Sequence, residues 1–187
     1  MRDDLFNRTK VPMTKEEVRA ISLDKLDLQQ AKRFLDVGAG TGSVSIQAAL
    51  THPNLEVVAI EQKLEAIALS QENINHFGCK NITLHEGVAP IHLEGKFDAV
   101  FVGGTGGNMR EIFDWCQGLL NPAGRLVLNF ILLENALEAS QICEEMGWKN
   151  IEIVTIQASR WTALGKGHYF KPQNATIIIS CQKRSEG

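Results

Sequence analysis

The chain has 187 residues, of which 44% are hydrophobic and 22% charged, and a net charge of −3. This composition predicts one globular domain over residues 1–187 and argues against a nucleic-acid partner or an acidic membrane surface. The four cysteines form no C-x-x-C pair and the five histidines show no metal-ligand spacing, so we expect free thiols and no metal site. Without a signal-peptide core or an apolar stretch long enough to span a bilayer, we expect a cytoplasmic protein with no membrane partner.

The first dozen residues are polar and irregular. A capping box from Thr14 to Glu17 then predicts a helix that begins at Thr14. Val18, Ile21 and Leu26 supply its apolar stripe.

Strands and helices alternate after this first helix. Strands are expected at 33–37, 56–60, 82–86, 97–102 and 125–130. Helices are expected at 43–50, 64–77, 109–119 and 134–146, with Gly78 and Asn108 as caps and a turn at 121–124. Two β-rich runs, 151–157 and 175–181, follow as an antiparallel pair joined by a loop.

The turn after the first strand carries the most informative motif. Gly38, Gly40 and Gly42 have the spacing G-x-G-x-G, and Ser43 stands where the dinucleotide motif G-x-G-x-x-G has its third glycine. Glu61 follows the second strand, where an acid can accept hydrogen bonds from ribose hydroxyls. This combination is typical of S-adenosylmethionine (SAM) methyltransferases, whose cofactor has no pyrophosphate.

The element pattern and the glycine spacing predict the same fold class. We expect an α/β, Rossmann-like, class I SAM-dependent methyltransferase with a seven-stranded sheet of order 3-2-1-4-5-7-6. Its last strand is antiparallel, whereas a dinucleotide domain would keep a parallel sixth strand.

Other residues at this sheet edge are candidates for binding. Asp36 has two open interpretations, orienting the glycine loop or capping the next helix. Ala89 lies after the third strand, where methyltransferases contact adenine, and Val88 replaces the acid that many of them use there. We expect backbone groups near Ala89 and apolar packing to hold the adenine.

A glycine-rich segment, 103–107, follows the fourth strand at the edge that faces the methyl donor. We expect Gly103 and Gly104 to contact a bulky anionic substrate through exposed backbone N–H groups. The alternative is a flexible connection without a ligand. Arg160, in the loop between the last strands, is either a clamp for a substrate carboxylate or a solvated charge.

These motifs together resemble the decarboxylating precorrin (carbon-15) methyltransferases of corrin biosynthesis, over nearly the whole chain. The segments that carry the resemblance are 12–19, 36–42, 86–90, 102–107 and 131–134. In that family the threonine equivalent to Thr14 touches the cofactor. The resemblance therefore implies a cofactor site made of Thr14, Gly38, Ala39, Gly40, Thr41, Gly42, Glu61 and Ala89.

The resemblance also implies the reaction. SAM would methylate carbon 15 of a contracted tetrapyrrole, and the acetate side chain on ring C would lose carbon dioxide. A chain with one domain is like the stand-alone form, which favours a cobalt-containing (cobalt-precorrin) substrate, and members of the family form homo-oligomers, with a tetramer expected. No residue is assigned as a catalytic acid or base, because a bound carbon nucleophile needs mainly alignment.

Two other classes of function stay open at this stage. One is a SAM methyltransferase that acts on RNA or on a protein carboxylate, against which the acidic charge and the absence of an Asn/Asp-Pro-Pro-aromatic clamp argue. The other is an NAD oxidoreductase or a nucleotide-binding module, against which Ser43 and the terminal antiparallel pair argue.

Overall fold

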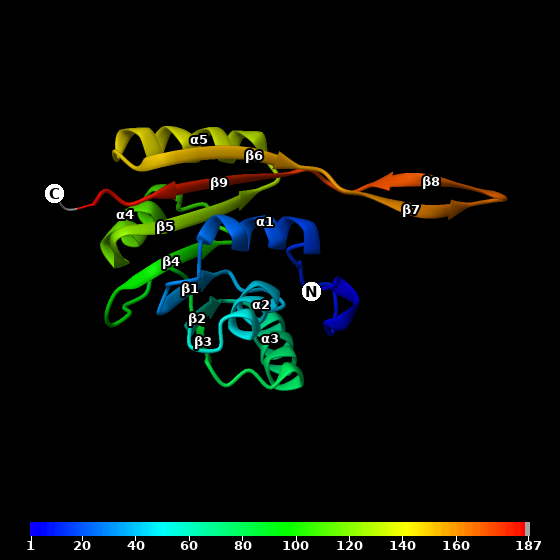
Figure 1. The fold of residues 1–187 in the computed structure, drawn as a ribbon, viewed down its shortest axis with the longest axis horizontal. Coiled ribbons are helices and arrows are strands. Elements are labelled where there is room, and N and C mark those ends of the chain that lie inside the picture. Colours follow the sequence, from blue (N-terminus) through cyan, green and yellow to red (C-terminus); the bar gives the residue numbers. More distant parts are fainter. Residues whose placement is uncertain (186–187) are drawn as a thin grey trace.

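The computed structural model describes residues 1–185 and shows an α/β body from which a long hairpin projects (Figure 1). Within these residues the central sheet has seven strands, in the order β3-β2-β1-β4-β5-β9-β6. Its strands are β1 (Arg33–Val37), β2 (Glu56–Glu61), β3 (Ile82–Glu86), β4 (Phe97–Val102), β5 (Leu120–Phe130), β6 (Lys149–Ile156) and β9 (Thr176–Gln182). The helices are a short 3₁₀ turn (Asp3–Leu5), α1 (Glu16–Leu26), α2 (Ser43–Thr51), α3 (Leu64–Phe77), α4 (Met109–Leu119) and α5 (Leu133–Glu145).

The strand directions confirm the predicted sheet. Strands β1 to β5 pair in parallel, and β9 pairs antiparallel with both β5 and β6. Strand β9 thus takes the place of the predicted seventh strand, between the fifth and the sixth. The carboxyl ends of the parallel strands therefore share one edge, where α/β sheets bind their ligands.

The central strands β1, β2 and β4 are buried on both faces, which explains why they are almost continuously apolar, whereas the edge strands β3 and β6 are largely exposed or half-buried. Successive side chains of β1 point to opposite faces. Leu35 packs in the cluster that includes α4 and α5, whereas Phe34 packs with α1 and α2. This two-sided packing fixes the strand ends that carry the functional loops.

The structure differs from the sequence prediction between β6 and β9. The expected loop is a hairpin of β7 (Ser159–Leu164) and β8 (Gly167–Pro172), and Figure 1 shows it extending well beyond the body. Gly165 begins its two-residue turn at φ +59°, a conformation that favours glycine. Cross-strand aromatic contacts stabilise the hairpin. Trp161 stacks on His168, with ring centroids 4.9 Å apart, and makes an edge contact with Phe170.

Smaller differences concern turns and caps. The predicted turn at 121–124 is instead an insertion within β5, because the pairing steps from Phe97–Leu120 to Ala99–Arg125. Gly78 is confirmed as the C-cap of α3, with φ +66°. Asn108 stands at the N-cap of α4 but makes no side-chain capping bond. In the described part of the chain no helix is both long and apolar enough to cross a membrane.

Candidate active site

A cavity of about 460 Å³ opens at the carboxyl edge of the sheet. It is lined by the loops after β1 to β5, by the N-terminal strap (Val11–Lys15) and by the base of the hairpin. Of the predicted site residues, the lining contains Thr14, Gly38, Ala39, Gly40, Glu61, Ala89, Gly103 and Gly104. Thr41, Gly42 and Arg160 lie outside it.

The glycine loop after β1 depends on close backbone packing. Gly38 and Gly40 adopt φ +76° and +57°. A Cβ atom on Gly40 would lie 2.9 Å from the carbonyl oxygen of Pro12, so only glycine lets the strap pass over the loop. The N–H groups of Gly38 and Ala39 donate to the carbonyl of Ile60 at 2.9 and 3.0 Å. The loop is thus fixed between the strap and the end of β2.

Glu61, the last residue of β2, has its carboxylate at the cavity wall and is only 7% exposed. One oxygen accepts from the N–H of Gly40 at 2.9 Å. The other accepts from the N–H groups of Gln62 and Lys63 at 2.8 and 2.9 Å. A carboxylate offers about four acceptor positions, so these three bonds orient the group and leave capacity for a ligand hydroxyl.

Of the two roles predicted for Asp36, the structure supports the second, a cap on the next helix. Its carboxylate is fully buried and accepts from the backbone N–H and the hydroxyl of Ser45, in the first turn of α2. Burial raises the pKa of Asp36 to about 6, the Ser45 bonds oppose this rise, and the charge of Glu61 adds to it. The N-terminus of α2 therefore already holds a carboxyl group of the protein.

Thr41 and Gly42 lie beneath the loop, because α2 begins directly after them. Thr41 is buried, and its carbonyl accepts from the amide of Asn73 at 2.9 Å. A Cβ atom on Gly42 would lie 2.6 Å from the hydroxyl oxygen of Ser70, so this glycine lets α2 approach α3. The structure gives both residues packing roles, and their contact with a cofactor stays a prediction.

The glycine segment after β4 packs directly against the glycine loop, because β1 and β4 are neighbouring strands. The N–H of Gly103 donates to the carbonyl of Val37 at 2.9 Å, and a Cβ atom there would lie 3.2 Å from the carbonyl oxygen of Gly38. A Cβ atom on Gly104 would meet no atom within 4 Å, so the cavity is open there. Positive φ angles occur at Gly106 and Gly107, not at Gly104, so its absent side chain matters for space alone.

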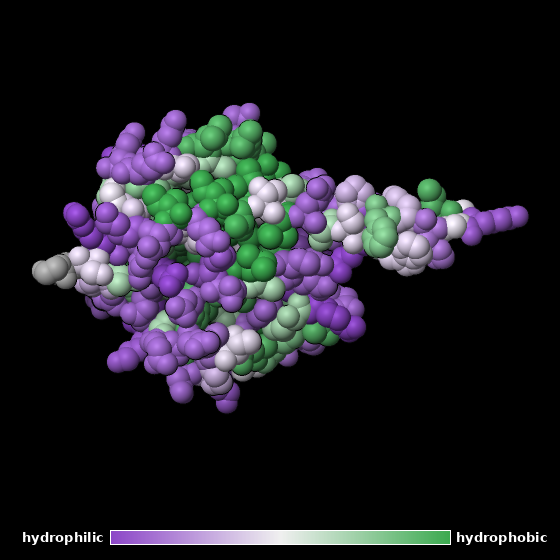
Figure 2. All heavy atoms as spheres, turned by 45° about the horizontal axis from the view of Figure 1, so that its top comes forward, coloured by the Kyte–Doolittle hydropathy of each residue, from purple (hydrophilic) through white to green (hydrophobic). Residues whose placement is uncertain are grey.

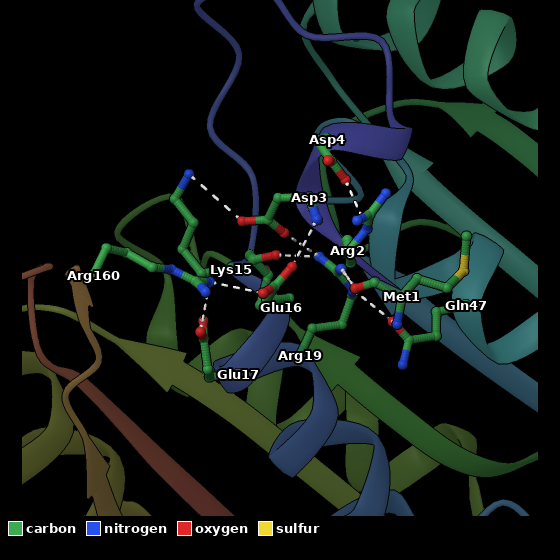
Figure 3. Close-up of polar contacts among 11 residues, drawn as sticks. Met1, Arg2, Asp3, Asp4, Lys15, Glu16, Glu17, Arg19, Gln47 and Arg160 are labelled. Carbon is green, nitrogen blue, oxygen red and sulfur yellow. Dashed lines mark hydrogen bonds and ion pairs between the residues drawn. The ribbon is translucent and has the colours of Figure 1, made fainter. Parts of the chain in front are cut away.

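The predicted capping box at Thr14 is wrong. Helix α1 begins at Glu16, with Lys15 as an N-cap that makes no side-chain bond. The strap is held instead by Arg19, which is completely buried and donates to the carbonyl of Thr14 and to the side chain of Gln47 (Figure 3). Burial lowers the pKa of Arg19, and the nearby Asp3 carboxylate counteracts this. A bond from Arg19, which Gln47 orients, therefore replaces the predicted cap.

Arg160 projects from β7 toward the start of α1 (Figure 3). One guanidinium nitrogen, Nη2, lies 2.8 Å from a carboxylate oxygen of Glu16 and 2.5 Å from one of Glu17. The hydrogen bond from the backbone N–H of Asp3, followed by the one from Arg160, lowers the pKa of Glu16. The residue thus ties the hairpin to the helix that follows the strap, and it stands two residues beyond Ala158 of the cavity lining.

Sequence reasoning missed the contribution of the hairpin base and of the residues after β5. Ile156, Gln173 and Asn174 line the cavity from the two arms of the hairpin, and Ile131 lines it after β5. The position of Ile131 at the end of a parallel strand was an available signal. Among the lining residues that the structure describes, Glu61, Lys15 and Lys63 are the ones with titratable side chains.

Comparisons with known proteins identify the family. A family model for the precorrin methyltransferase domain matches residues 4–183. The cobalt-precorrin-6B C(15)-methyltransferase (decarboxylating) of Salmonella typhimurium is 50% identical over 184 residues, which cover 98% of this chain and 96% of that protein. A probable enzyme of the same name from Saccharolobus solfataricus is 36% identical over 97% of this chain and 94% of its own length.

Solved structures agree with this result. A precorrin-6y C5,15-methyltransferase from Geobacter metallireducens superposes with a TM-score of 0.91 at 34% identity, covering 98% of this chain and 96% of that one. A precorrin 8w decarboxylase from Methanobacterium thermoautotrophicum gives 0.87 at 31%, covering 97% and 98%. A SAM-dependent O-methyltransferase from Thermotoga maritima, at 18% identity and a TM-score of 0.79, shares the fold. The chain thus belongs to the precorrin methyltransferase family.

Proposed function

We propose that this protein transfers the methyl group of SAM to carbon 15 of a cobalt-precorrin-6-type tetrapyrrole. In the same proposal, the acetate side chain on ring C loses carbon dioxide. The observation that carries it is one cavity whose lining includes the glycine loop, Glu61 and the open segment 103–106. This cavity belongs to a chain that is 50% identical to a protein named for this reaction.

The residues of the cavity fit an adenosine group. The carboxylate of Glu61 is oriented by three backbone N–H groups and keeps an acceptor position for a ribose hydroxyl. Residues 38–40 of the glycine loop line the cavity beside this carboxylate, and Thr14 and Ala89 line the same cavity. We assign the cofactor contacts to these residues.

The N-terminus of α2 supports SAM over a dinucleotide. In dinucleotide-binding domains, the pyrophosphate sits on the N–H groups of this helix. Here Asp36 already accepts from the N–H of Ser45, so a pyrophosphate would compete with a buried carboxyl group. A cofactor without phosphate avoids this competition.

The proposed chemistry needs little acid–base assistance. SAM supplies a methyl group activated by its sulfonium, and the attacking electron pair comes from the macrocycle carbon. The electrons released with carbon dioxide flow back into the conjugated ring. The protein's part is then to align the two reactants and exclude water, which agrees with the small number of titratable side chains in the lining.

Arg160 is our candidate for anchoring a carboxylate that the substrate retains. Glu16 and Glu17 use its Nη2 nitrogen, and a guanidinium has further N–H donors at Nε and Nη1. A clamp on the departing carboxylate would stabilise the ground state and oppose its loss.

We also propose a homo-oligomer, with a tetramer favoured, in the cytoplasm. The exposed aromatic side chains of the hairpin support self-association, since Trp161 and Phe170 are each more than 60% exposed. Sedimentation equilibrium of the full chain measures this state.

Two measurements test the proposed function. Calorimetry should show tight binding of S-adenosylhomocysteine and none of NAD. With SAM and a cobalt-precorrin-6B substrate, the protein should release S-adenosylhomocysteine at a rate that depends on the tetrapyrrole. Tight binding of NAD, or no release above the rate without tetrapyrrole, would contradict the proposal.

A further inference from the structure

Three consecutive large aliphatic residues, Ile131, Leu132 and Leu133, follow β5 and are 65%, 59% and 59% exposed. A run of this kind is costly in solubility unless it has a function. Figure 2 shows hydrophobic side chains gathered on the body near the base of the hairpin. These three residues belong to the segment 131–134 that resembles the precorrin methyltransferases, and the first of them also lines the cavity. We call them the apolar rim.

The apolar rim is continuous with the cavity. Phe130 and Ile131 line the cavity, so the rim begins at its wall and extends outward. Strands β4 and β5 are parallel neighbours, with Val102 opposite Leu128. The rim therefore follows the strand next to the one that ends in the open glycine segment, where we place the methyl acceptor.

The size of the cavity requires a surface outside it. Ligand pockets hold about 300–1,000 Å³, and this one, at about 460 Å³, is at the lower end of that range. Under the proposed function it must accommodate SAM. A tetrapyrrole therefore reaches the methyl group with one edge while most of its area lies across the mouth. Its ring faces are apolar and its periphery carries carboxylates, so it needs an apolar support at the mouth with polar groups around it.

We propose that the apolar rim binds one face of the tetrapyrrole macrocycle and thereby selects the substrate. This inference rests on the proposed function and names the surface by which that site holds its substrate. Gly103 and Gly104 would face the reacting edge, and the polar side chains of Gln173 and Asn174, at the cavity wall, would meet peripheral carboxylates.

The test replaces Leu132 and Leu133 by serine, singly and together. Both residues are more than half exposed, so the variants should fold. We expect KM for cobalt-precorrin-6B to rise about 10-fold or more in the double variant, because apolar contact area is lost. The affinity for S-adenosylhomocysteine should not change. Leu50→Ser, an exposed leucine on α2, is the matched control.

A binding assay without turnover separates this inference from the proposed function. Uroporphyrin III, a planar polycarboxylate tetrapyrrole, is titrated into the protein loaded with S-adenosylhomocysteine, and its fluorescence is followed. A weaker affinity in the double variant than in the control supports the rim even if methylation of precorrin fails. The proposed role of the rim would be overturned, and the proposed function kept, by the following result. The wild type turns over normally, and the double variant has an unchanged KM and an unchanged affinity for the porphyrin.

A second copy of the chain is the competing occupant of this surface. Leu137 lies one turn further along α5, is 55% exposed and does not line the cavity. If the surface joins copies, Leu137→Ser and the double variant should both lower the mass found by light scattering. That result would overturn the proposal. The proposal would be supported if the mass is unchanged and if KM rises strongly on substitution of Leu132 and Leu133 but little on substitution of Leu137.

Discussion

Replacing Glu61 tests how the cavity holds its ligand. If the carboxylate accepts from ribose hydroxyls, Glu61→Ala removes charged hydrogen bonds that contribute about 1.5–3 kcal/mol. Affinity for S-adenosylhomocysteine should then fall about 10- to 150-fold. The same substitution also leaves the N–H groups of Gly40, Gln62 and Lys63 without their acceptor. Loss of affinity could thus follow from a disordered loop rather than from a lost ligand contact.

Two further measurements separate these causes. An N–H left without a partner costs about 1–3 kcal/mol where it is buried, and at this chain length 1 kcal/mol shifts Tm by about 2–4 °C. Gly40 is half-buried whereas Gln62 and Lys63 are exposed to water, so the main cost falls on Gly40, and calorimetry in the absence of ligand measures it as a lower Tm. The ligand contact is isolated by comparing S-adenosylhomocysteine with its 2′-deoxy and 3′-deoxy analogues.

Wild type should prefer the ligand with both hydroxyls, and Glu61→Ala should lose this preference for at least one position. The coupling energy from this cycle excludes contributions that both ligands share. If the variant discriminates between the ligands as strongly as the wild type does, Glu61 only supports the loop and our assignment is wrong.

Three other substitutions test separate parts of the site. Gly104→Val adds bulk to an open part of the cavity without backbone strain. Methyl transfer should therefore fall sharply, while calorimetry shows unchanged S-adenosylhomocysteine binding. Full activity of this variant would show that the segment only connects β4 to α4. Arg160→Ala should raise KM for the tetrapyrrole without changing the ratio of methylated to decarboxylated product, and normal kinetics would remove its role. The pKa of Asp36 is raised from an ordinary 3.8 to about 6 in the folded state, so the folded state binds more protons between these values. Its contribution to the free energy of unfolding should therefore decline by about 2 kcal/mol from pH 4 to 6.5, measured by denaturation of wild type relative to Asp36→Asn. A difference that is flat or rises with pH would contradict this.

The sequence was sufficient to predict the sheet and to bring the glycine loop and Glu61 to one cavity, although their contact with a cofactor stays a prediction. Apolar runs indicated the central strands because both of their faces are covered, and Gly40 and Glu61 were recognised by residue type and spacing. Gly40 must lack a Cβ atom to pass beneath Pro12, and Glu61 ends β2 beside the glycine loop. Such local requirements can be recognised from the sequence.

Features set by tertiary contacts were not predictable in the same way. The hairpin has no buried face, so β7 and β8 lack the apolar alternation that indicates a strand, although Gly165 marked its turn. The capping box failed because Arg19 takes the carbonyl of Thr14 and Arg160 takes the carboxylate of Glu17. Arg160 comes from β7, and Arg19, although close to Thr14 in the chain, is oriented by Gln47 and Asp3, so neither contact could be placed before the fold was known.

The central claim is that one protein both methylates and decarboxylates the same macrocycle. It is tested most directly by incubating the full chain with deuterated-methyl SAM and cobalt-precorrin-6B, and taking a mass spectrum of the tetrapyrrole after complete turnover. We predict a product that has gained the labelled methyl group in place of one hydrogen and has lost the mass of carbon dioxide. A product that carries the label together with all its original carboxylates, or that loses carbon dioxide without gaining the label, would contradict the account.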